Sequence, residues 1–169
     1  MKGVMFVEKG KAAIIAEDMP VCKPDTMLCK VLYSGVSNGT ERSFLMDGNY
    51  GAGWPFPKRI AYQHVSEVIE VGSQIACFQV GDVVFSATYP GHVEYHLLKE
   101  SDLVIKLPQG FDLEQVVRLA HRGDIKLRPL VRDVVALDDA VRIYDTLRDA
   151  PSQLLGTVFV VGAERGWEV

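Results

Sequence analysis

Residues 27–46 read MLCKVLYSGVSNGTERSFLM and contain the clearest change of secondary structure in the chain. Apolar and polar side chains alternate roughly over Met27–Val36, which predicts a β-strand. Gly39–Met46 then has the composition of a short helix that ends near Gly48. We therefore expect a strand that leads directly into a helix.

The connection between these two elements, SGVSNGTER at residues 34–42, gathers polar groups in a short space. One interpretation is helix capping, with Asn38 or Thr40 as the N-cap and Glu41 favourable in the first turn. The other is a functional site that uses the hydroxyls of Ser37 and Thr40, the Glu41 carboxylate and the Arg42 guanidinium. Chemistry alone favours capping, because such polar side chains readily bond to nearby backbone groups.

The rest of the first two-thirds is typical of short strands separated by turns. Asn49–Pro57 is crowded with Gly and Pro and predicts a loop. The expected strands are Gly3–Val7, Lys11–Ala16, Tyr62–Val71, residues 83–87, Gly91–Leu98 and Leu103–Leu107. Strands at this spacing favour an antiparallel barrel or sandwich.

Helical patterns dominate the final third of the chain. The expected elements are a helix over Leu113–His121 between the cap Asp112 and Gly123, a helix from Leu137-Asp138-Asp139 to Pro151, and a strand over Thr157–Val161. The second helix has one apolar stripe: Ala140, Ile143, Tyr144 and Leu147. The paired carboxylates of Asp138 and Asp139 suit a helix start better than acid–base catalysis, because the helix dipole favours them there.

Composition limits the class of protein. The 169 residues, 48% of them hydrophobic and 24% charged, are typical of one globular domain. A net charge of −4 and a pI near 5.5 provide no basic face, so we expect neither nucleic acid nor membrane as a partner. Three dispersed cysteines do not form a disulfide framework, and no apolar stretch is long enough to cross a bilayer. These features predict a cytoplasmic location.

Several familiar motifs fail on spacing or context. His92 and His96 would lie about 13 Å apart along a strand, so we expect two surface or rim histidines rather than a metal site. Gly51-x-Gly53 lacks a third glycine and precedes prolines, which indicates a flexible loop rather than a dinucleotide site. Gly162 and Gly166 have no helix after them and are assigned to a tail. The chain contains no G-x-S-x-G hydrolase motif.

Taken in order, six segments resemble the catalytic domain of medium-chain dehydrogenase/reductases, the zinc-type alcohol dehydrogenase superfamily. They are MKGVMFVEKGKAAI, VLYSGVSNGTE, AYQHVSEVIEVGSQI, FQVGDVVF, GHVEYHLLKESDLVIKLPQG and GDIKLRPLVRDVVALDDAVRIYDTL. The third is similar to the family's G-H-E-x-x-G-x-V-x-x-V-G segment, and the fourth to its V-G-D-x-V. The resemblance covers nearly all of residues 2–161. It implies a mainly β fold with α, a GroES-like, partly open β-barrel with two or three helices.

The sequence departs from the zinc enzymes of this family at the metal positions. The family's ligand cysteine falls near Ser37, its histidine on Tyr62 and the adjoining glutamate on Gln63, and none of these is a customary zinc ligand. His64 would share a face with Tyr62 in a regular strand. The Cys-rich zinc lobe expected between Ser86 and Gly91 has no counterpart. The resemblance therefore implies no catalytic and no structural metal, as in the zinc-lacking, bacteriochlorophyllide a dehydrogenase-like branch.

The second departure concerns the nucleotide. In the family a complete Rossmann domain separates two halves that here meet at Gln115 and Val116. The resemblance implies one rejoined domain, residues 1–115 and 116–161, followed by a tail, residues 162–169. A complete family member uses NAD(P), whereas this chain is expected to bind no cofactor, because the Rossmann domain that holds the nicotinamide is absent. The candidates for a substrate cleft are Ser37, Thr40, Glu41, Tyr62, Gln63 and His64.

Three functions follow as hypotheses. The first is the catalytic domain of an alcohol dehydrogenase-like, NAD(P)-dependent oxidoreductase of a small alcohol or carbonyl compound. It would be inactive alone, or completed through self-association or a nucleotide-binding partner. The second is a non-enzymatic GroES-like binding or assembly module. The third, ranked last, is a small enzyme with His64 or Tyr62 as an acid–base group, since the sequence indicates no orienting partner for either.

Overall fold

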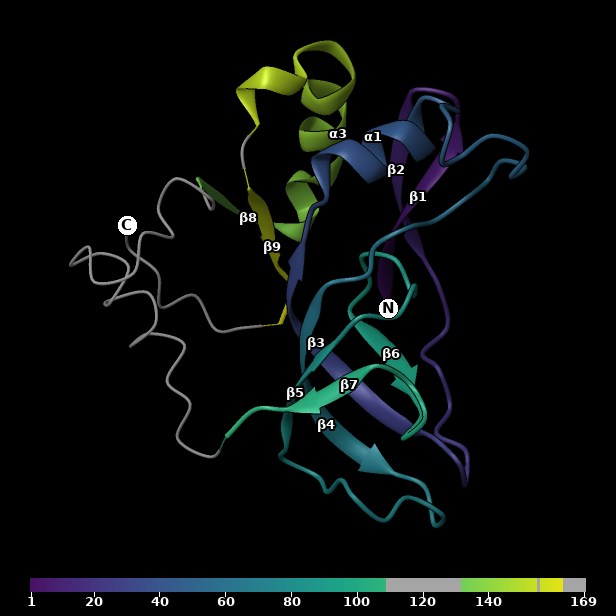
Figure 1. The fold of residues 1–169 in the computed structure, drawn as a ribbon, viewed down its shortest axis with the longest axis vertical. Helices are drawn as coiled ribbons and strands as arrows, with labels where there is room; N and C mark the ends of the chain where they lie inside the picture. Colours follow the sequence, from purple (N-terminus) through teal and green to yellow (C-terminus); the bar gives the residue numbers. More distant parts are fainter. Residues whose placement is uncertain (109–131, 155, 163–169) are drawn as a thin grey trace, which may run out of the picture.

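The computed structural model describes residues 1–108, 132–154 and 156–162. Its fold is mainly β with two α-helices in these residues, as the sequence predicts (Figure 1). The elements are β1 (Lys2–Glu8), β2 (Lys11–Ala16), β3 (Met27–Gly35), α1 (Asn38–Leu45), β4 (His64–Val71), β5 (Val83–Ser86), β6 (Tyr95–Leu98), β7 (Val104–Lys106), β8 (Asp133–Ala136), α3 (Ala140–Asp149) and β9 (Thr157–Val160). Short 3-10 helices, η1 (Leu137–Asp139) and η2 (Pro151–Gln153), flank α3. The helix expected over Leu113–His121, the junction at Gln115 and Val116, and residues 163–169 of the tail lie outside the described residues.

Strand β3 is the centre of a seven-stranded sheet. The strand order is β7-β5-β4-β3-β9-β8, and β6 pairs with β3 as well. Neighbouring strands are antiparallel except for β8 and β9, which are parallel and have α3 in the connection between them. The hairpin of β1 and β2 is a separate two-stranded sheet, and single bridges link Gly3 to Val93, just before β6, and Phe6 to Lys58, before β4. The described strands therefore form an open sheet with an added hairpin rather than a closed barrel.

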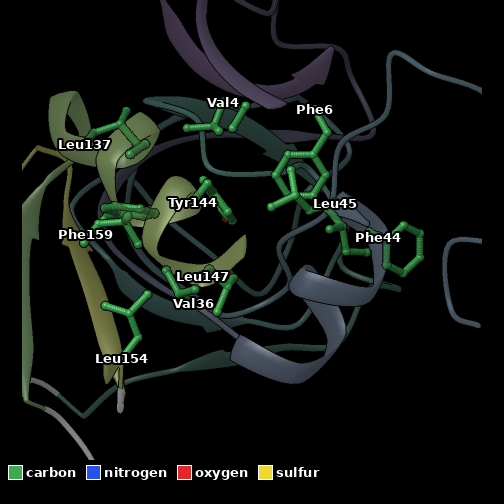
Figure 2. Close-up of a cluster of buried hydrophobic side chains, with 14 residues drawn as sticks. Val4, Phe6, Val36, Phe44, Leu45, Leu137, Tyr144, Leu147, Leu154 and Phe159 are labelled. Carbon is green, nitrogen blue, oxygen red and sulfur yellow. The ribbon is translucent and has the colours of Figure 1, made fainter. Parts of the chain in front are cut away.

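The larger core lies where both helices meet the hairpin. Figure 1 shows α1, α3, β1 and β2 gathered at one end of the molecule and β4 to β7 at the other. The buried side chains of this core include Val4, Phe6, Val36, Phe44, Leu45, Tyr144, Leu147, Leu154 and Phe159 (Figure 2). The rings of Phe6 and Tyr144 pack edge to face with centroids 4.9 Å apart. The N-terminal strands and the C-terminal helix thus share one apolar interior.

Helix α3 matches its sequence pattern closely. Its predicted apolar stripe is buried in full: Ala140, Ile143, Tyr144 and Leu147. Asp138 and Asp139 lie at its start, as expected, and the helix ends before Pro151. The Arg42 side chain donates from Nε to the Leu147 carbonyl at 3.0 Å, so α1 also satisfies the end of α3.

A smaller core fills the region between β3, β4, β5 and β6. Its fully buried members are Met27, Cys29, Val68, Val84 and Leu98. Burial raises the pKa of the Cys29 thiol to about 12, which keeps it protonated and unreactive at neutral pH.

Strand β8 is absent from the sequence prediction, and three further differences concern the region of the candidate site. Strand β4 begins at His64 rather than at Tyr62, and β6 covers only the second half of the strand expected over Gly91–Leu98. The N-cap of α1 is Ser37 instead of Asn38 or Thr40. None of the helices in the described residues has both the length and the hydropathy needed to cross a bilayer.

Candidate functional site

A pair of hydroxyl groups lies at the start of α1. The Tyr62 hydroxyl donates a hydrogen bond of 2.7 Å to Ser37 Oγ. Ser37 ends the extended segment after β3, while Tyr62 precedes β4, and both residues are half-buried. The ring of Tyr89, which is 71% exposed, lies 5.9 Å from the Tyr62 ring, tilted by 54°. Tyr62 therefore has an orienting partner, and the structure corrects the expectation that it has none.

Two other predicted residues follow this pair closely in the chain and lie outside the core. Thr40 is half-buried in the first turn of α1, and Gln63 is exposed. A Cβ built on Gly35 would lie only 2.9 Å from Gln63 Oε1, so the absence of a side chain at Gly35 leaves room for the amide. The Gly35 N–H also donates to the Gln63 carbonyl at 2.9 Å.

Glu41 lies beneath the hydroxyl pair and is fully buried. Its Oε1 accepts the Ser37 backbone N–H at 2.8 Å. Its Oε2 accepts from His92 Nε2 at 3.0 Å and from the hydroxyl of Tyr144. Burial and the neighbouring carboxylate raise the pKa of Tyr144 well above its ordinary value, so it remains a hydrogen-bond donor. The carboxylate thereby fixes the backbone of Ser37 to both α3 and the segment before β6.

His92 extends this buried network to β3. Its Nε2 lies 3.0 Å from Glu41 Oε2, and its Nδ1 lies 2.6 Å from the Ser34 hydroxyl oxygen. The expectation of a surface or rim histidine is wrong, because His92 is 1% exposed and packs edge to face on Phe159. The segment leading to β6 passes through the core at this point. The strand pattern predicted over Gly91–Leu98 did not indicate this burial.

The Ser34–His92–Glu41 arrangement has the residue types of a hydrolytic triad but cannot act as one. In such triads the serine faces one imidazole nitrogen and the carboxylate the other, with the serine open to substrate. Ser34 is 0% exposed, so no substrate carbonyl can reach its oxygen. The network stabilises the position of Ser37 instead. Of its members, only Glu41 was a candidate from the sequence. A signal for Tyr144 was also available, since a tyrosine in an apolar stripe needs a hydroxyl partner when buried.

His64 and His96 form a second buried group, within the sheet. Their rings lie 5.3 Å apart, and both side chains are almost fully buried. His64 Nε2 lies 3.0 Å from the Gly91 carbonyl, and His96 Nε2 lies 3.0 Å from Ser66 Oγ. Burial lowers the pKa of His64 to about 3 and that of His96 to about 4, so both are neutral at pH 7.

These positions bear on two expectations. The surface or rim location expected for His96 is wrong, as it is for His92. Tyr62 and His64 do not share a strand face, because β4 starts only at His64. The hydrogen bond to Gly91 also gives His64 the partner that the sequence did not indicate.

The donor set does not suit a zinc ion. Ser37, Tyr62 and Gln63 offer hydroxyl and amide oxygens where zinc sites use thiolate, imidazole or carboxylate. Throughout the described ranges, no three His, Cys, Asp or Glu side chains gather closely enough to hold a metal ion. The absence of a metal from the whole protein stays a prediction.

The described residues also do not fit the pyrophosphate of a nicotinamide nucleotide. In the loop with Gly51 and Gly53, Lys58 Nζ donates a hydrogen bond of 3.1 Å to the Gly51 carbonyl. The loop thus presents a carbonyl oxygen to this buried amine, whereas a phosphate site presents backbone N–H groups to its ligand. The N-terminus of α3 follows Asp138 and Asp139, whose charges would repel phosphate. At α1 the Glu41 carboxylate already occupies the Ser37 N–H. None of these three places within the described ranges forms a dinucleotide cradle, and the expectation that the chain binds no nucleotide stays a prediction.

Comparisons with known proteins agree with this architecture. No family model matches the chain. It is 39% identical to a quinone oxidoreductase of Pseudomonas aeruginosa over 69 residues, which are 40% of this chain and 21% of that protein.

Solved structures match over a longer range. Galactitol-1-phosphate dehydrogenase from Escherichia coli matches 80% of this chain with a TM-score of 0.58 at 17% identity, through 48% of its own length. An alcohol dehydrogenase superfamily protein from Novosphingobium aromaticivorans matches 86% of this chain at 18% identity, with a TM-score of 0.56 and 48% of its length covered. The quinone oxidoreductase from Coxiella burnetii matches 80% of this chain with a TM-score of 0.53 at 19% identity. The match covers 48% of that structure. The chain thus spans about half the length of these structures, and the match is one of fold.

Proposed function

The chain has the GroES-like fold of the catalytic domain in the medium-chain dehydrogenase/reductase superfamily, and on this premise we propose that it is the substrate-binding half of an NAD(P)-dependent oxidoreductase. The observation that supports this most strongly is the match to about half of each dehydrogenase structure. The identity with a quinone oxidoreductase over 69 residues agrees with it. The substrate would be a small alcohol or carbonyl compound.

In this proposal the substrate meets the surface around Ser37. The Ser37 hydroxyl would donate to its oxygen, with the Tyr62 hydroxyl donating to Ser37 from behind, and Thr40 and Gln63 would border it. Glu41 and His64 are too deeply buried to touch a substrate, so Glu41 would act as a positioning residue for Ser37 and His64 would stabilise the sheet. The chain would hold the substrate without zinc.

The nucleotide would be held elsewhere. Residues 107–132 connect β7 to β8, and a connection of this length is too short for a nucleotide-binding domain. The strands at its two ends carry exposed apolar side chains: Leu103 and Ile105 at β7, which are 63% and 55% exposed, and Val134 on β8, which is 45% exposed. Such surface suits docking of a nucleotide-binding domain from another chain. When bound there, NAD(P) supplies the hydride chemistry.

A chimera tests the proposed function. A nucleotide-binding domain from a related quinone oxidoreductase would be inserted between Gln115 and Val116, and NADPH oxidation measured with a panel of quinones and aldehydes. The proposal predicts turnover of at least one carbonyl class, and a loss of about 10-fold or more in Ser37→Ala because a donor to the reacting oxygen is removed. A folded chimera that binds NADPH yet turns over no member of the panel would refute it.

A further inference from the structure

The surface around Ser37 combines a reinforced hydrogen-bond donor with an exposed aromatic ring. Ser37 Oγ accepts from Tyr62 and gives no capping bond to α1. The described residues therefore offer no acceptor for the hydroxyl proton of Ser37. A hydroxyl that accepts one strong hydrogen bond becomes a better donor of its own proton, because polarisation passes along the chain of bonds. Ser37 is thus prepared to donate to an oxygen of a ligand.

Tyr89 provides the second part. Its side chain is 71% exposed although its ring contacts that of Tyr62. An exposed aromatic face next to a hydrogen-bond donor favours a flat ring over a saturated one by about 0.5–1.5 kcal/mol, which is about 2- to 10-fold in affinity. Tyr89 lies in the connection between β5 and β6, while Ser37 begins α1 and Tyr62 precedes β4, so three segments meet at this surface.

Unused hydrogen-bonding capacity adjoins the same residues. Asn38 Oδ1 and Thr88 Oγ1, each next in the chain to Ser37 or Tyr89, are buried and lack a partner among the described residues. Polar atoms left in this condition are uncommon in folded proteins and mark places where a water or a ligand completes the bonding.

From this geometry we infer that the Ser37–Tyr62–Tyr89 surface selects planar aromatic carbonyl compounds, with Ser37 as donor to the carbonyl oxygen and Tyr89 as the stacking face. The inference rests on the proposed function and specifies its substrate class. Tyr62 is a positioning residue in this arrangement, since it acts through Ser37. Tyr89 determines specificity, because its contact distinguishes a flat ring from a puckered one.

Binding of two unreactive amides tests the inference without any nucleotide. Benzamide and cyclohexanecarboxamide present the same carbonyl on a flat and on a saturated ring. Each would be titrated into the full chain carrying 13C-labelled tyrosine, and the ring signals of Tyr62 and Tyr89 followed by NMR. We expect benzamide to bind in the millimolar range and 2- to 10-fold more tightly than the saturated amide.

Three variants assign the contributions. Tyr89→Ala should remove the preference for benzamide, and Tyr62→Phe should weaken both amides by about 2- to 10-fold through the lost hydrogen bond. Val21→Ala, at a side chain that is 77% exposed, is the matched surface control and should change neither. Since Tyr89 is exposed and Tyr62→Phe keeps the ring, both variants should fold, which circular dichroism checks.

Two results would overturn the inference. One is equal affinity for the two amides, and the other is the absence of any saturable change in the tyrosine signals. Neither depends on hydride transfer, so the amide titration can fail while the chimera is active. Conversely, an inactive chimera would refute the oxidoreductase role and leave a selective aromatic carbonyl site.

Discussion

The hydroxyl of Tyr144 on α3 donates a hydrogen bond to Oε2 of Glu41 on α1, inside the main core. The other oxygen of the same carboxylate, Oε1, accepts a hydrogen bond from the backbone N–H of Ser37. A residue from the last third of the chain thereby fixes the position of a candidate substrate contact near the end of β3. The described C-terminal segment is part of the site's support and not an appendage to it.

Removal of the Tyr144 hydroxyl should be costly. Tyr144→Phe keeps the ring packed on Phe6 but removes one donor to a buried carboxylate, which should lower the free energy of unfolding by about 1–3 kcal/mol. Urea denaturation measures this directly. Tyr50→Phe, at a ring that is 67% exposed, is the control and should stay within about 0.5 kcal/mol of the parent protein. Equal stability of the two variants would argue against the hydrogen bond.

Replacement of Glu41 should cost more than loss of any single donor. Glu41→Ala leaves His92, Tyr144 and the Ser37 N–H without their acceptor, and we expect a loss of about 3 kcal/mol or more. Thr40→Ala, one residue earlier and half-buried, is the matched control, with an expected change below about 0.5 kcal/mol. If thermal and urea unfolding give the same loss of stability for Glu41→Ala and Thr40→Ala, Glu41 is not the centre of the network.

Acid should destabilise the protein through its buried histidines. The pKa values of His64 and His96 are lowered from 6.5 to about 3 and about 4, mainly by burial. Between these values and 6.5 the unfolded chain binds more protons than the folded one, so the free energy of unfolding decreases as pH falls. Each histidine contributes a slope of up to about 1.4 kcal/mol per pH unit in this range.

Urea unfolding at a series of pH values from 7 to about 4 tests this linkage. His64→Gln cannot gain the proton, so its pH slope should be smaller than that of the parent protein by about one proton. A parent protein whose stability is constant from pH 7 down to 4.5 would contradict the buried, neutral state of both rings.

Zinc should be absent from the purified protein. Oxygen donors at Ser37, Tyr62 and Gln63 replace the ligands that zinc prefers, so elemental analysis should give far less than one zinc per chain. A chelator should leave the unfolding transition unchanged, because we expect no metal to contribute to the folded state. One tightly held zinc per chain would contradict the proposal of a zinc-free site.

The sequence predicts the elements of the fold well because the signals are local. The alternation over Met27–Val36 corresponds to β3, and the stripe from Ala140 to Leu147 is the buried face of α3. Gly and Pro at residues 49–57 mark an irregular segment, as expected. The order of motifs along the chain indicates the GroES-like fold, which the solved structures support.

The buried polar network was not predictable in this way, because its members are distant in sequence. Ser34, Glu41, His92 and Tyr144 come from four separate segments, and only the packing of those segments brings them together. Glu41 looked like a first-turn carboxylate, a position where exposure is usual. His92 and His96 looked like surface residues of one strand, whereas the chain enters the core before β6 begins.

The central claim is that this chain binds substrate while a nucleotide-binding domain outside it binds the coenzyme. Titration of the full chain into NADH and NADPH, followed by nicotinamide fluorescence, tests it most directly. The account predicts no saturable change in fluorescence with either nucleotide, because no dinucleotide cradle exists in the described residues. Saturable binding of either nucleotide at micromolar concentration would contradict it.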